Sequence, residues 1–85
     1  MLYLLGNGSK TEGMEFLMGD ASAVGVLFQD GIYLKCDSLE GREIYAIRDD
    51  VDSRGMEGVL PGWIRRISYE ELVPLIENNI VISFI

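Results

Sequence analysis

The sequence predicts a small α/β domain of the three-layer α/β/α type, with a five-stranded parallel sheet between helices. Apolar runs that suit buried strands alternate with helix-forming segments along the whole chain. This order implies parallel strands joined by right-handed crossovers. With 85 residues, the chain has room for one domain, residues 1–85.

The first two strands are predicted from continuous apolar runs. Residues 2–5 form the first run, which a glycine-containing turn interrupts, and residues 23–28 form the second. Between the two runs, Ser9 and Glu12 have the S-x-x-E spacing of a capping box, and apolar residues follow at helical spacing. We therefore expect a helix between the first two strands.

Short connections are predicted around the third strand. Asp30 can cap a short helix after the second strand, before a loop over residues 37–41. The third strand covers residues 43–47, and either Asp49 or Asp50 can cap the short helix that follows it.

The last part of the chain repeats the same order. The short helix, residues 51–54, ends at Gly55, where a left-handed residue is wanted. The fourth strand, residues 63–67, contains two adjacent arginines, which indicates a sheet edge. Ser68 opens a second capping box and a helix, and residues 80–85 form the final apolar strand.

Composition excludes several classes of protein. The formal net charge is −7, so binding to DNA or RNA is not expected. The chain has no histidine and one cysteine, Cys36, which excludes a Ser-His-Asp triad, an internal disulfide and a cysteine-based zinc cage. The start lacks the basic region of a signal peptide and is too short to span a bilayer. We expect a cytoplasmic protein without cofactor, metal or membrane association.

The size of the chain favours association with a partner. A domain this small buries only somewhat more than ~60% of the surface of its unfolded chain, yet 48% of its residues are hydrophobic. The predicted helices are few and short for the sheet that they must cover. We therefore expect an oligomer rather than a tightly packed monomer.

Two segments invite a functional interpretation but have a simpler structural one. Residues 6–11 follow a strand and open a helix, yet they match neither the Walker pattern nor the dinucleotide fingerprint, which favours a plain turn. Cys36 could carry sulfur as a thiolate, but Lys35 and Asp37 beside it oppose each other in charge. A lone cysteine in an apolar segment is more often a small buried residue.

The carboxyl ends of the second and third strands are the predicted functional edge. A polar, glycine-containing turn follows the second strand directly, and two aspartates follow the third. The carboxyl ends of parallel strands meet at one edge, where open α/β sheets receive ligands and partners. The candidate residues for contact with a partner or for the rim of a site are Gln29, Asp30, Gly31, Tyr33, Asp49 and Asp50.

Four blocks of the chain together resemble the TusB/DsrH family of sulfur-relay proteins. The blocks are MLYLL at 1–5, VLFQDGIY at 26–33, IYAIRDD at 44–50 with SRG at 53–55, and ISYEELV at 67–73. The resemblance implies a DsrE/F/H-like domain that assembles with DsrE/TusD-like and DsrF/TusC-like subunits. Such assemblies pass persulfide sulfur between proteins, for tRNA wobble-uridine 2-thiolation or for sulfur oxidation.

One departure from this family shapes the functional expectation. DsrH-type members carry a cysteine in the first helix, whereas the first helix expected here, near residues 12–18, has none. The resemblance therefore implies a non-catalytic subunit whose partner supplies the reactive cysteine. The alternatives are a sulfurtransferase that uses Cys36, and a homo-oligomeric binding module that holds a small anion near residues 6–9.

Overall fold

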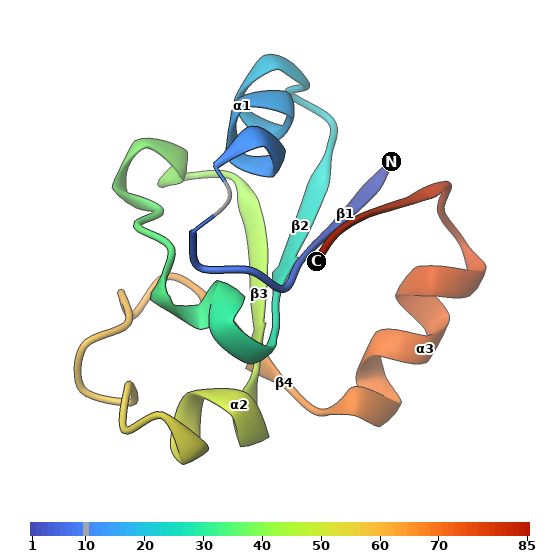
Figure 1. Ribbon diagram of the computed structural model, residues 1–85. Coiled ribbons are helices and arrows are strands. Elements are labelled where there is room, and N and C mark those ends of the chain that lie inside the picture. Colours follow the sequence, from blue (N-terminus) through green and yellow to red (C-terminus); the bar gives the residue numbers. More distant parts are fainter. Residues whose placement is uncertain (10) are drawn as a thin grey trace.

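Five strands form one parallel sheet in the computed structural model, which describes residues 1–9 and 11–85 (Figure 1). The order across the sheet is β4-β3-β2-β1-β5, and every printed pairing is parallel. This confirms the predicted fold class. The strands are β1 (Leu2–Leu5), β2 (Val24–Leu27), β3 (Glu43–Ile47), β4 (Arg65–Ile67) and β5 (Val81–Phe84).

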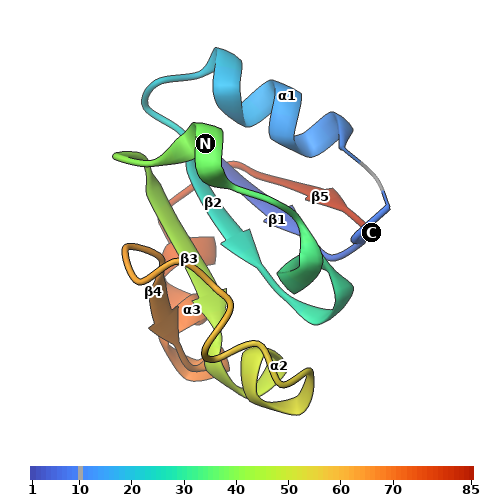
Figure 2. The same cartoon turned by 90° about the vertical axis from the view of Figure 1, so that its left-hand side faces the viewer.

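The strand order explains the layers. From β1 to β4 each strand lies beside the one before it, always in the same direction, so right-handed crossovers keep these connections on one face. The step from β4 to β5 returns across the sheet, and α3 covers the opposite face (Figure 2). The connecting elements are α1 (Glu12–Gly19), the 3-10 turns η1 (Gln29–Tyr33) and η2 (Asp37–Leu39), α2 (Arg48–Ser53) and α3 (Tyr69–Glu77).

The two faces of the sheet are covered unequally. On the first face, α1, the 3-10 turns and the loop before β4 enclose a large apolar cluster that includes Leu17, Leu39 and Leu60. On the second face, Leu72 of α3 packs over a smaller cluster. Apolar side chains around that cluster stay only partly buried, among them Leu4, Val24, Phe28, Tyr45 and Val81. A single helix thus covers this face, and its rim remains open to solvent.

The capping box predicted at the start of α1 is wrong. The helix begins at Glu12 after Thr11, whose side chain makes no capping bond. The Ser9 N–H instead donates to Asn7 Oδ1 at 2.8 Å, a local bond that competes with capping. Lys10, in the segment considered for phosphate binding, lies outside the described residues. The second capping box is confirmed, because Ser68 and Glu71 bond each other reciprocally at the start of α3.

Helix α2 begins earlier than predicted and without an aspartate cap. It starts at Arg48, directly after β3, and neither Asp49 nor Asp50 caps it, since Ile47 occupies the cap position. Gly55 has φ of +62°, which confirms its predicted left-handed conformation.

Three further predictions need correction. Asp30 caps no helix, because it lies inside η1, which follows Phe28. The loop expected over residues 37–41 contains the turn η2, and β4 is shorter than predicted, since Trp63 and Ile64 precede it. The position of β4 at the edge is as predicted.

Candidate functional site at the carboxyl edge of the sheet

Asp50 joins three elements at the carboxyl edge of the sheet. It lies in the first turn of α2, after β3. Its Oδ2 accepts a hydrogen bond from the Gln29 N–H at 2.8 Å, which ties down the start of η1. The same oxygen accepts from the Tyr69 hydroxyl at 2.5 Å, which holds the start of α3. One carboxylate therefore fixes the segments that follow β2, β3 and β4.

Arg54 extends this cluster toward the surface. Its guanidinium lies 3.1 Å from Asp30 Oδ1 and 3.7 Å from Asp50 Oδ1. The Arg54 side chain is only 21% exposed, whereas Asp30 is 69% exposed. We call Gln29, Asp30, Asp50, Arg54 and Tyr69 the edge cluster.

The Gln-Asp-Gly turn is shaped by close backbone contact with the end of β1. A Cβ placed on Gly31 would lie 1.8 Å from the Leu5 carbonyl oxygen, so only glycine fits there. Gln29 has φ of +48°, a left-handed conformation that is uncommon for a residue other than glycine. The bond from its N–H to Asp50 holds it in this conformation. The turn is thus set by Gly31 from below and by Asp50 from the side.

Tyr69 acts in this cluster as a hydrogen-bond donor. Burial, the hydrogen bond to Asp50 and the negative charge of Asp50 together raise the pKa of Tyr69 to about 12. The hydroxyl therefore keeps its proton near neutral pH and can donate it to the Asp50 carboxylate. With Oδ2 accepting two bonds and Oδ1 facing Arg54, Asp50 is placed to position these elements rather than to accept a proton from a substrate.

The remaining predicted site residues lie apart from Asp50. Tyr33 is half exposed and borders a polar hollow of about 360 Å³ with Asp30 and the turn after β1. Asp49 is exposed on α2, and its charge adds only the smallest contribution to the raised pKa of Tyr69. The structure thus brings Gln29, Asp30 and Asp50 together and leaves Asp49 outside the edge cluster.

Sequence reasoning missed two members of this cluster. Arg54 and Tyr69 were noted only within the family-like blocks, yet they supply the cation and the hydroxyl that meet Asp50. The order of parallel strands offered a signal, because whatever follows β4 must also reach this edge.

Arg66 has a different role from the one predicted. Its guanidinium donates to the carbonyl oxygens of Leu60, Pro61 and Ile64 at distances of 3.0, 3.1 and 2.8 Å. It therefore holds the loop before β4 in place. Its neighbour Arg65 is exposed on the edge strand, where a charge discourages pairing with other sheets.

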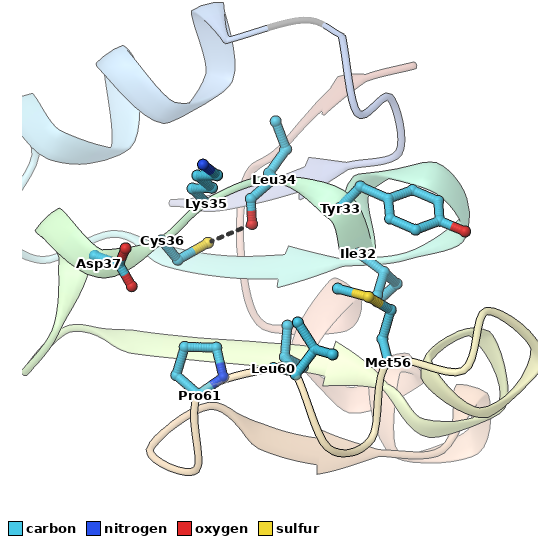
Figure 3. A pocket seen from close by; sticks show the side chains of 10 residues that line it. Ile32, Tyr33, Leu34, Lys35, Cys36, Asp37, Met56, Leu60 and Pro61 are labelled. Atoms are coloured by element: carbon cyan, nitrogen blue, oxygen red, sulfur yellow. Dashed lines mark hydrogen bonds between the residues drawn. The ribbon is translucent and has the colours of Figure 1, made fainter.

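Cys36 lies in the wall of an apolar pocket of about 260 Å³ between the segment after η1 and the loop before β4 (Figure 3). Leu60 and Pro61 face it across this pocket, and its thiol lies 3.7 Å from the Leu34 carbonyl oxygen (Figure 3). The residue is 2% exposed. Burial, together with the charge of Asp37, raises the pKa of the Cys36 thiol to about 11. A thiol in this state is a poor nucleophile near neutral pH.

Metal and membrane chemistry find no support in the described part of the chain. Among residues 1–9 and 11–85, no group of three or more Cys, Asp or Glu side chains is arranged to hold a metal ion. None of the helices described is long and apolar enough to cross a bilayer.

Comparisons with known proteins support the fold. No protein-family model matches the chain, and no curated protein matches it. Among solved structures, the chain is similar to the solution NMR structure of protein Tm0979 from Thermotoga maritima, with 28% sequence identity and a TM-score of 0.67. The match covers 93% of this chain and 94% of that one. Over nearly its whole length, the chain is thus similar to another small α/β protein with five parallel strands.

Proposed function

We propose that this protein is a non-catalytic subunit of a sulfur-relay complex, in which a partner subunit supplies the cysteine that carries persulfide. The proposal combines the resemblance to the TusB/DsrH family with the properties of the edge cluster. Its partners would be DsrE/TusD-like and DsrF/TusC-like subunits in the cytoplasm. The relayed sulfur would serve tRNA wobble-uridine 2-thiolation or sulfur oxidation.

The environment of Cys36 is the observation that carries this proposal. In persulfide transfer, an acceptor thiolate attacks the outer sulfur of the donor persulfide, one S–S bond forms and one breaks, and the donor leaves as a thiolate. The acceptor must therefore be accessible and ionised. Cys36 is 2% exposed and its pKa is raised to about 11, so it meets neither condition. Since it is the single cysteine of the chain, a relay would need a cysteine from a partner.

The unequal cover of the sheet supports a role in assembly. The face under α3 keeps a rim of partly buried apolar side chains, including Leu4 and Val24. Burying such a rim against a neighbour gives roughly 25 cal/mol per Å² of apolar surface. The edge cluster in turn fixes the shape of the carboxyl edge through hydrogen bonds and ion pairs, which suits a surface that presents geometry to a partner.

A sulfur-transfer assay on a reconstituted complex tests the proposal. The chain is purified from its own host with the subunits that accompany it, and radiolabelled sulfur from a cysteine desulfurase is followed through the complex. We expect transfer to require this chain, to be unchanged by Cys36→Ser, and to be lost when the partner's cysteine is replaced. Transfer onto Cys36 of the purified chain alone would instead favour the sulfurtransferase alternative.

A homo-oligomeric module without a relay role is the second candidate. It is favoured by the apolar side chains on the surface, such as Phe16 and Ile80, which are 60% and 71% exposed. If the chain recovers only its own copies from the host, and its omission leaves sulfur transfer unchanged, this alternative replaces the relay.

A further inference from the structure

The outer surface of α3 carries an apolar stripe with the spacing of a helix-packing seam. Tyr69, Val73, Ile76 and Ile80 follow one another at intervals of four, three and four residues, which is the heptad pattern of helices that pack side by side. Their exposed fractions are 42%, 51%, 40% and 71%. The first three lie in α3, and Ile80 continues the spacing in the connection to β5. We call these four residues the α3 seam.

The α3 seam is separate from the side chains that attach the helix to the sheet. Leu72 is buried in the cluster beneath α3, and Leu75 packs against the same cluster. The helix therefore satisfies its own domain with one face and leaves a second apolar face in solvent. Its sequence is more apolar than its place in this fold requires, which is a feature of interaction surfaces.

Acidic side chains border the α3 seam. Glu70 and Glu77 are both exposed and lie seven residues apart. Glu70 is three residues before Val73 and Glu77 is four residues after it, so both are helix-surface neighbours of the seam. No lysine or arginine occurs in α3. These two glutamates occupy the kind of flanking position at which charge selects the partner in paired helices.

A second copy of this chain is a poor occupant for the α3 seam. If two α3 helices met in parallel, Glu70 would face Glu70, and in an antiparallel pair Glu70 would face Glu77. Both arrangements place like charges together, on chains that each carry a formal net charge of −7. A helix whose apolar seam is flanked by Lys or Arg would instead meet opposite charges.

We propose that the α3 seam docks an amphipathic helix of a different protein, with apolar residues at heptad spacing and Lys or Arg seven residues apart beside them. This deepens the proposed function, on which it rests, by naming the surface that receives a partner subunit and the chemistry of that partner's helix.

Two synthetic helices with the same apolar seam, one flanked by lysines and one by glutamates, test this inference. Each is titrated onto the isotopically labelled full-length protein, and binding is followed by NMR shifts and by fluorescence anisotropy. We expect the lysine-flanked helix to bind roughly tenfold more tightly or better, to weaken as salt is raised, and to shift the signals of α3. Equal binding of both helices, binding of neither, or shifts confined to other elements would overturn the inference.

Matched variants separate the seam from a general attraction of basic peptides to an acidic protein. Glu70→Lys with Glu77→Lys should reverse the preference between the two helices. Glu12→Lys with Glu15→Lys makes the same change in net charge on α1 and should leave the preference unchanged. An equal effect of both pairs would mean that the attraction is nonspecific.

The apolar part of the seam needs its own control. Val73→Ser with Ile76→Ser should abolish binding, whereas Val59→Ser, at another exposed apolar position, should not. These positions are on the surface, so the variants are expected to fold. If the seam fails these tests while sulfur transfer in the reconstituted complex still requires the chain, the seam is wrong and the relay stands. If the lysine-flanked helix binds as expected but transfer ignores the chain, the relay is wrong and the docking surface remains.

Discussion

Replacement of Asp50 by alanine should destabilise this protein more than any neighbouring loss of charge. The substitution removes the acceptor for the Gln29 N–H and for the Tyr69 hydroxyl, as well as the ion pair with Arg54. It also leaves Gln29 in a left-handed conformation without the bond that holds it. The segments after β2 and β4 then lose their connection to α2.

The size of the effect follows from these contacts. A hydrogen bond to a charged group contributes about 1.5–3 kcal/mol, and the two donors to Asp50 can partly regain water when it is removed. The ion pair adds a few tenths of a kcal/mol, because Arg54 keeps Asp30 as a partner. We expect a loss of about 2–3 kcal/mol, or roughly 10–20 °C in Tm for a domain of this size.

Asp49→Ala is the matched control. It removes the same side chain from the same first turn of α2, and so the same favourable interaction with the helix dipole, but no bond to η1 or α3. Urea denaturation followed by circular dichroism gives the free energy of unfolding of both variants. The difference between them isolates the contacts of Asp50. Equal losses would refute the role that we assign to Asp50.

Three further predictions concern single side chains. Tyr69→Phe should remove a loss of stability between about pH 10 and pH 12, because a tyrosine whose pKa is raised to about 12 in the folded state stabilises that state below its unfolded pKa and ceases to do so as pH rises through the folded pKa. Urea titrations at several pH values check this, and an unchanged alkaline slope would contradict it. Cys36 should react with an aromatic disulfide reagent at pH 8 only as fast as the protein unfolds, so rapid labelling of the native state would contradict its burial. Arg66→Ala should cost about 1–3 kcal/mol and speed hydrogen exchange in the loop before β4, whereas Arg65→Ala should leave that loop unchanged.

The edge cluster shows where local sequence patterns stop being informative. The strand ends placed Gln29, Asp30 and Asp50 at one edge, as predicted from the parallel order. The role of Asp50 was nevertheless predicted wrongly as a helix cap, because capping depends on neighbours within four residues. Its partners are 21 and 19 residues away in the chain, and only the packed sheet brings them within hydrogen-bond distance.

The sequence by itself determined the secondary structure of the sheet and its parallel order. Apolar runs bounded by turns can be recognised locally, and short crossovers between them leave few topologies open. It also determined the capping box at Ser68 and the left-handed Gly55, since both depend on local geometry.

The tertiary structure alone decided which face of the sheet remained half covered and which side of α3 faced solvent. Both depend on the return from β4 across the sheet to β5, a step between residues that the sequence does not show to be neighbours. It also decided that Cys36 is buried against Leu60, because the wall that encloses the thiol comes from a loop more than twenty residues away. Burial, exposure and ionisation arise from contacts between distant segments, and those contacts exist only once the chain has folded.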